Sequence, residues 1–180
     1  MASIHLYNEE KSIHDLTLIT SFLAKENIAF GTFPLSGIAV DARKKEELTD
    51  TERQQVLDSH AQDSAAFQSL SGFRQDVVCF WPSFSHLDYV LSRFAPIHFH
   101  YENEYWYCFD GAACFTFLGN RGEKYRVTLE PGEYLRVPEG RWQWFELTES
   151  KYFKSMRFFY TSHSVPTYET PAEFLAEIVP

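Results

Sequence analysis

Two histidines and a glutamate lie close together near the middle of the chain, in a pattern that suits a metal ion. His98 and His100 are two residues apart, and Glu104 follows four residues later. Because side chains alternate along a β-strand, all three would lie on one face of an extended segment. Two imidazoles and one carboxylate are the ligand set of non-haem Fe(II) oxygenases, which leaves coordination positions open. The spacing therefore predicts a divalent-metal site on a strand over residues 97–107.

The chain after this point reads as a series of short strands. Runs of apolar residues are separated by Gly, Pro, Asn and Ser, which favour turns. Aromatic residues make up 17% of the chain, which also favours β-structure. The pattern predicts a mainly β fold, a barrel or double-sheet jelly roll. Its expected strands cover residues 97–107, 113–118, 124–129, 133–138, 142–147 and 153–160.

The N-terminal half adds helices to these strands. Ser12 is expected to cap a first helix, and Thr49 with Glu52 to open a second that runs to about Leu70. Ser85 is expected to begin a short third helix, and residues 35–47 to form a loop. The remaining N-terminal segments with strand patterns are 4–7, 28–33 and 76–81.

The length of 180 residues predicts one domain. We expect residues 1–92 to form an α/β lobe packed on the barrel and residues 93–162 to form the barrel core. Residues 163–180 are expected to form a tail, with a short helix opened by Thr170 and Pro171.

Charge and cysteine content narrow the classes of function and location. The formal net charge is -9, which argues against binding a nucleic-acid backbone. The three cysteines form no Cys-x-x-Cys pair, and the sequence shows neither a signal region nor a long apolar span. We therefore expect a cytoplasmic protein with free thiols that does not bind membranes.

A second motif follows the first at a fixed distance. The first reads His98-x-His100-x3-Glu104 and ends at Gly111, and the second runs from Gly132 through Pro138 and Gly140 to Gln143. Together they resemble the two signature motifs of the cupin fold, a small jelly-roll barrel with its helices packed outside. In that fold the second motif ends in a histidine, the fourth metal ligand, brought in from a neighbouring strand.

Within the cupins, the chain resembles acireductone dioxygenase over nearly its whole length. The residues that carry this resemblance are His98, His100, Asn103, Glu104, Trp106, Val137, Pro138, Gly140, Gln143, Trp144, Phe145, Glu146, Phe153, Met156, Arg157 and Phe159. The resemblance implies cleavage of the enediol 1,2-dihydroxy-3-keto-5-methylthiopentene by O2, in methionine salvage. With Fe(II) the products are a 2-keto acid and formate, and with Ni(II) a shorter acid, formate and CO.

The resemblance also implies roles for individual residues. The metal ligands would be His98, His100, Glu104 and Gln143. The substrate would be bound by Phe94, Trp106, Phe145 and Arg157, with Arg157 also catalytic. Fe(II) is the expected metal, with Ni(II) or Mn(II) as alternatives. The expected partners are a small-molecule substrate and O2, and the expected assembly is a monomer or a homodimer.

Three positions depart from the family pattern: Gln143 replaces the fourth histidine, Trp106 an arginine and Asn103 an aspartate. Gln143 is a harder, weaker donor than imidazole, so it either ligates the metal or hydrogen-bonds to a ligand. Arg157 either steadies the substrate anion or forms an ion pair, for example with Glu146. Two other functions therefore stay open. One is a cupin dioxygenase, isomerase or decarboxylase acting on another substrate, and the other is a non-catalytic module that binds a metal or small molecule.

Overall fold

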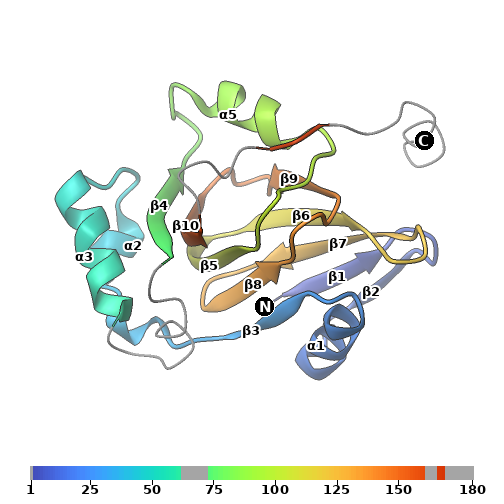
Figure 1. Ribbon diagram of the computed structural model, residues 1–180. Helices are drawn as coiled ribbons and strands as arrows, with labels where there is room; N and C mark the ends of the chain where they lie inside the picture. Colours follow the sequence, from blue (N-terminus) through green and yellow to red (C-terminus); the bar gives the residue numbers. More distant parts are fainter. Residues whose placement is uncertain (1, 62–72, 161–165, 169–180) are drawn as a thin grey trace.

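Two five-stranded antiparallel sheets form the body of the protein (Figure 1). The computed structural model describes residues 2–61, 73–160 and 166–168. The strand orders are β2-β1-β7-β6-β9 and β3-β8-β5-β10-β4. The strands are β1 (Ser3–Leu6), β2 (Lys11–Ile13), β3 (Ala29–Thr32), β4 (Arg74–Phe80), β5 (Glu104–Gly111), β6 (Ala113–Leu118), β7 (Lys124–Leu129), β8 (Glu133–Val137), β9 (Gln143–Leu147) and β10 (Phe153–Phe159). This architecture confirms the mainly β fold predicted from the sequence.

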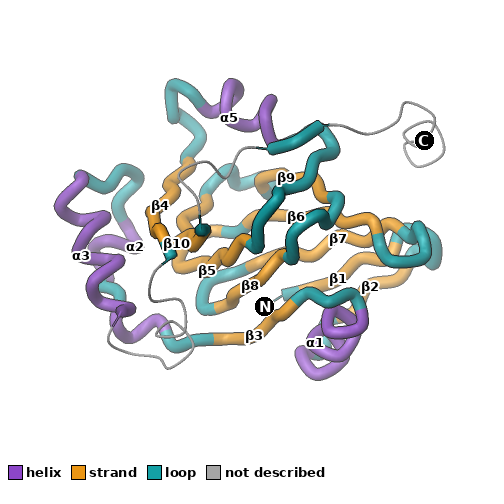
Figure 2. The backbone as a smooth tube through the Cα atoms, viewed as in Figure 1, coloured by secondary structure: helices purple, strands orange, loops and turns teal. Residues whose placement is uncertain are grey.

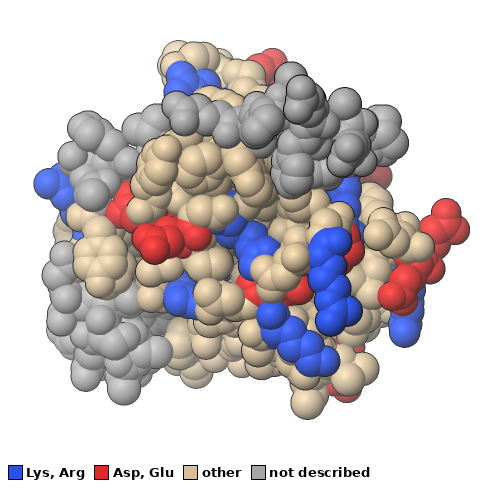
Figure 3. All heavy atoms as spheres, turned by 45° about the vertical axis from the view of Figure 1, so that its right-hand side comes forward, with Lys and Arg blue, Asp and Glu red and all other residues tan. Residues whose placement is uncertain are grey.

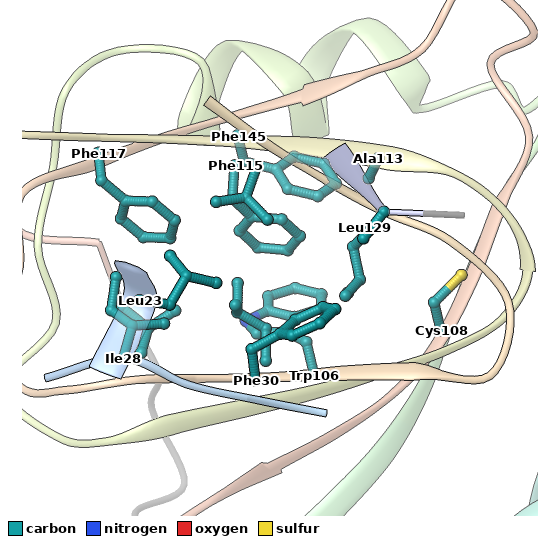
Figure 4. Packing of buried hydrophobic residues seen from close by; sticks show 14 of the residues in the cluster. Leu23, Ile28, Phe30, Trp106, Cys108, Ala113, Phe115, Phe117, Leu129 and Phe145 are labelled. Atoms are coloured by element: carbon teal, nitrogen blue, oxygen red, sulfur yellow. The ribbon is translucent and has the colours of Figure 1, made fainter. Parts of the chain in front are cut away.

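Aromatic side chains from both sheets fill the barrel. Trp106 on β5 and Phe145 on β9 stack with their ring centroids 5.8 Å apart, and Phe115 on β6 meets Phe145 edge-on at 5.2 Å. Figure 4 shows Trp106 and Phe30 pointing into the interior toward Phe115 and Phe145. Each strand alternates inward apolar residues with outward polar ones where only one face is covered, as on β7.

The helices lie outside the sheets (Figure 2). Helix α1 packs Ile19 and Leu23 into the core beside β3, α3 lies against β4, and α5 lies against β9. The helices are α1 (Leu16–Lys25), the 3-10 turn η1 (Leu35–Gly37), α2 (Val40–Lys44), α3 (Asp50–Ala61) and α5 (Leu87–Phe94). In the part of the chain that the structure describes, no helix is both long and apolar enough to span a membrane.

The helix starts were predicted with mixed success. Asp15, not Ser12, caps α1, because its side chain accepts a hydrogen bond from Leu18 N at 2.9 Å while Ser12 lies in β2. The capping box at α3 is confirmed: Thr49 N donates to Glu52 Oε2 at 2.9 Å, and Glu52 N donates to Thr49 Oγ1 at 3.3 Å.

Two other expectations near the helices were wrong. Residues 35–47 are not only a loop, since they contain η1 and α2. The third helix begins at Leu87 rather than Ser85. The expected continuation of α3 to Leu70 and the C-terminal helix at Thr170 lie outside the described residues.

The bounds of β6 and β7 agree with the prediction better than the bounds of the strand that was expected to carry His98, His100 and Glu104. β6 and β7 have the predicted bounds, whereas the strand expected at 97–107 begins only at Glu104 and runs to Gly111. The N-terminal strands are members of both sheets, since β1 pairs with β7, β3 with β8 and β4 with β10. The division at residues 92 and 162 stays a prediction.

Charged side chains of both signs are intermixed on the face shown in Figure 3. The view shows no large area of Lys and Arg alone, which agrees with the net charge of -9. This face therefore offers no extended basic surface of the kind that tracks a phosphate backbone.

Candidate metal centre

The segment that carries the two histidines is held in place by β9. His98 forms an isolated bridge with Gln143, in which His98 N donates to Gln143 O at 3.0 Å and Gln143 N donates to His98 O at 2.8 Å. His98 and His100 are 1% and 4% exposed, while Phe99 between them is only partly buried. The alternation predicted for these residues is therefore present, although they lie before the first regular residue of β5.

The two sequence motifs meet at a turn. Gly140 adopts a positive φ of 71°, which costs glycine little, and its N–H donates to the carbonyl oxygen of His100 at 2.8 Å. The side-chain oxygen of Asn103 accepts a hydrogen bond from Glu139 N at 3.2 Å. These bonds hold the turn before β9 against the histidine segment, so Gln143 and Glu104 lie close together inside the barrel.

The imidazole of His98 is neutral and has a lone pair with which it can bind a metal ion. Its Nδ1 lies 2.8 Å from the carbonyl oxygen of Pro96, and a carbonyl only accepts, so Nδ1 carries the proton. Burial lowers the pKa of His98 to about 4. The imidazole is therefore uncharged at neutral pH, and its lone pair is on Nε2, the atom available to bind a metal ion.

The carboxylate of Glu104 joins the other donors. Glu104 Oε2 lies 3.3 Å from His100 Nε2 and accepts a hydrogen bond of 3.4 Å from Gln143 Nε2. The Oε1 atom of Gln143 is buried and has no hydrogen-bond partner among the described residues. A buried amide oxygen without a partner is costly, and a cation would satisfy it.

The four side chains are linked by pairwise contacts: His98 with His100, His100 with Glu104, and Glu104 with Gln143. Among the described residues, no three His, Cys, Asp or Glu side chains stand as a group in metal-binding geometry. Two imidazoles, a carboxylate and an unsatisfied amide oxygen nevertheless make a donor set that suits a divalent transition metal. The residues present therefore fit a metal ion in their chemistry.

A pocket of about 300 Å³ is lined by neighbours of these donors in the chain, although none of the four donors lines it. Its wall includes all four residues predicted to bind substrate: Phe94, Trp106, Phe145 and Arg157. The rings of Phe94 and His98 are 5.8 Å apart, which joins the pocket wall to the histidine segment. The pocket is mostly apolar, because the other lining side chains are mainly Val77, Val78, Cys79, Phe80, Phe84 and Val90.

Arg157 is paired with a residue that the sequence did not point to. Its Nε and Nη2 donate to the two carboxylate oxygens of Asp76, which lies opposite it on β4. The ion pair is thus with Asp76 rather than Glu146. Asp76 and Arg53 also line the pocket, and both were missed. Asp76 could have been noticed in the sequence as a charged residue that directly precedes an apolar strand. The strand register that pairs Asp76 with Arg157, however, cannot be predicted from one sequence.

Comparisons with known proteins show which family the chain resembles. The sequence model of the ARD/ARD' family matches residues 26–165. The chain is 34% identical to an acireductone dioxygenase of Microcystis aeruginosa over 84% of this chain and 85% of that protein. It is 28% identical to one from Bacillus subtilis, over 94% of this chain and 97% of the relative.

A solved structure supports the same relationship. An acireductone dioxygenase from Bacillus anthracis with a cadmium ion in its active centre superposes with a TM-score of 0.87 and 26% identity, covering 93% of this chain and 98% of the other. The matches confirm the resemblance and the fold class predicted from the sequence. They also confirm the general function, that of a metal-dependent dioxygenase. By sequence and by structure, the chain belongs to the ARD/ARD' family.

Proposed function

We propose that this protein is an Fe(II)-dependent dioxygenase that cleaves 1,2-dihydroxy-3-keto-5-methylthiopentene with O2 to a 2-keto acid and formate, as a step of methionine salvage. The observation that carries the proposal is a set of four buried metal donors, of which His98 meets Phe94 in the wall of an apolar pocket of about 300 Å³. Relatives named acireductone dioxygenase support the choice of substrate.

We assign His98, His100, Glu104 and Gln143 as the residues that hold the metal. When bound, the ion supplies a Lewis-acidic centre that neutralises the charge of the enediol oxygens. Hard oxygen donors make up half of the set, which favours Fe(II) or Mn(II) over Ni(II). The Nδ1–H of His98 bonded to Pro96 O and the bond from Gln143 Nε2 to Glu104 keep the donor groups oriented.

The pocket residues bind and orient the substrate. Phe94, Trp106 and Phe145 provide an apolar wall that receives the methylthio end and excludes water. Arg157 steadies the negative charge of the enediol and is our candidate catalytic residue. Its guanidinium lies 5.2 Å from the centre of the Trp106 ring, at the wall of the same pocket.

The partners we propose are the enediol and O2. We further propose that the protein is cytoplasmic, acts without nucleic acid or membrane, and is a monomer or homodimer. The three buried free cysteines suit a reducing compartment.

The direct test is turnover. Protein loaded anaerobically with Fe(II) is mixed with synthetic acireductone, and O2 uptake and formate are measured. Glu104→Gln should abolish uptake, because it removes the anionic donor, whereas Glu102→Gln should retain it. Uptake by the wild type no faster than by metal-free protein would rule the proposal out. Nickel loading with CO detection then distinguishes the two cleavage patterns.

A further inference from the structure

The guanidinium of Arg141 is largely shielded from water and lies in the turn between β8 and β9, two residues before Gln143. Its side chain is 10% exposed and that of Glu26 is 9% exposed, with Arg141 Nη1 3.3 Å from Glu26 Oε2. Taking both charges out of water is costly, and the cost is recovered only when each group finds well-placed partners. A pair of this kind therefore restricts the turn that carries it to few arrangements.

The guanidinium meets four acceptors, which come from two other parts of the chain. Nη2 donates to the carbonyl oxygen of Glu26 at 2.6 Å and to Asn120 Oδ1 at 2.9 Å. Nη1 donates to the carbonyl oxygen of Leu118 at 2.9 Å as well as to Glu26 Oε2. The same carboxylate oxygen accepts a hydrogen bond from Asn120 N at 2.8 Å. Arg141 thus joins the C-terminal end of α1 and the β6–β7 hairpin to the turn before β9.

The same turn is tied on its other side to the histidine segment. Gly140 N donates to the carbonyl oxygen of His100 at 2.8 Å. His98 and Gln143 exchange two backbone hydrogen bonds. Arg141 lies between these two attachments in the chain, so a shift of its backbone would move both. Because one residue separates Arg141 from Gln143, the bonds of the guanidinium help to set where β9 begins and where the amide of Gln143 lies.

We propose that Arg141 is a positioning residue for the metal centre: its pairing with Glu26 holds the turn before β9 in the arrangement that presents the amide of Gln143 to the metal. The inference rests on the proposed function, in which Gln143 is a ligand, and it adds two residues outside the ligand set on which the ligand geometry depends. Groups that orient ligands without binding the metal change metal affinity by about 10- to 100-fold. Glu26, far from the ligands in sequence, acts on them through Arg141.

The NMR spectrum of bound cadmium tests this directly. Protein loaded with ¹¹³Cd gives a signal whose chemical shift depends on the type, number and geometry of the donors. Arg141→Met and Glu26→Gln should each displace this signal and weaken cadmium binding about tenfold, measured by competition with a chelator. The double variant should bind cadmium no more weakly than Arg141→Met alone, because the two residues act as one unit.

Lys154→Met is the matched control. Lys154 is also a cation shielded from water, and it bonds to the carboxylate of Asp110 and to the carbonyl oxygen of Arg43. It lies on β10 and shares no printed contact with the turn before β9, so its variant should lose stability while the cadmium signal stays where it is in the wild type. An equal displacement in Lys154→Met and Arg141→Met would assign the change to lost stability and overturn the inference.

The outcomes separate this inference from the proposed function. If the wild type binds cadmium and turns over the acireductone with Fe(II), while Arg141→Met and Glu26→Gln keep its cadmium signal and affinity, the positioning role is wrong and the function stands. If both variants displace the signal but the Fe(II) protein consumes no O2 with the acireductone, the positioning role stands and the function fails. Should Arg141→Met not fold, the isosteric Glu26→Gln decides alone. A wild type that binds no cadmium overturns both.

Discussion

Arg157 and Asp76 lie directly opposite each other on β10 and β4 and form two hydrogen bonds, Nε to Oδ1 at 2.9 Å and Nη2 to Oδ2 at 2.6 Å. This planar pairing is the arrangement in which Arg and a carboxylate bind most strongly. It holds the guanidinium at the wall of the pocket, against the Trp106 ring, instead of letting it extend into solvent. The pair therefore fixes the position of the Arg157 guanidinium at the pocket wall.

Arg157→Met should lower kcat/KM about tenfold or more, since a charged hydrogen-bond donor contributes ~1.5–3 kcal/mol. Metal content should not change, because Arg157 is not among the proposed ligands. Arg126→Met is the matched control: Arg126 also lies over an aromatic ring on a strand, but on the opposite sheet and away from the pocket. Steady-state kinetics with metal analysis makes the comparison. Equal losses in both variants would assign Arg157 a structural role.

Gln143→His should strengthen metal binding, because imidazole is a better donor than an amide oxygen. The gain should be about tenfold or more for Ni(II) and smaller for Mn(II), following the preference of later metals for nitrogen. Competition with a coloured chelator measures both affinities. Gln143→Leu removes the donor and should weaken both metals. Identical affinities in all three proteins would show that Gln143 does not contact the metal.

Lys154 is a buried cation whose loss should destabilise the fold without touching the site. The residue is 2% exposed, and its Nζ donates to Asp110 Oδ2 at 2.8 Å and to the carbonyl oxygen of Arg43 at 2.6 Å. Lys154→Met should lower the free energy of unfolding by ~2 kcal/mol, less than for a fully buried pair because Asp110 is partly exposed. Urea denaturation measures the change, and the double variant with Asp110→Asn should lose less than the sum of the two single changes.

Two glycines with positive φ should respond differently to alanine. A Cβ on Gly111 would stand 2.0 Å from the carbonyl oxygen of Tyr152, whereas a Cβ on Gly122 would meet nothing within 4 Å. Gly122→Ala should cost ~1 kcal/mol for its left-handed backbone alone. Gly111→Ala should cost at least ~3 kcal/mol, because strand β10 must move away. Equal unfolding midpoints for the two variants would contradict the close contact between residue 111 and the carbonyl oxygen of Tyr152.

The parts of the fold that local pattern decides were predicted well. β6 and β7 begin and end where expected, because turn residues bound both runs and alternation is clear on β7. The start of α1 was misplaced because Ser12 and Asp15 both suit a cap, and pairing of residues 11–13 with β1 takes Ser12 into a strand. The pairing of residues 11–13 with β1 is a tertiary interaction, so the local sequence around Ser12 does not reveal it.

The candidate site shows the same division. Residue type and spacing were enough to propose His98, His100, Glu104 and Gln143 as metal ligands, and all four side chains are buried. Their role as ligands stays a prediction. The pairing of Asp76 with Arg157 and the unpaired Trp106 nitrogen were not predictable, because both depend on the register between strands far apart in sequence.

The proposed metal ligands come from both sheets, which has a mechanical consequence. Glu104 begins β5 in one sheet and Gln143 begins β9 in the other, so their hydrogen bond joins the two halves of the barrel. A metal ion bound by both Glu104 and Gln143 would link the two sheets at this end of the barrel. Loosening of the sheets and release of the ion would then be one event, and amide hydrogens of β5 and β9 would exchange more slowly, and in step, when the metal is loaded.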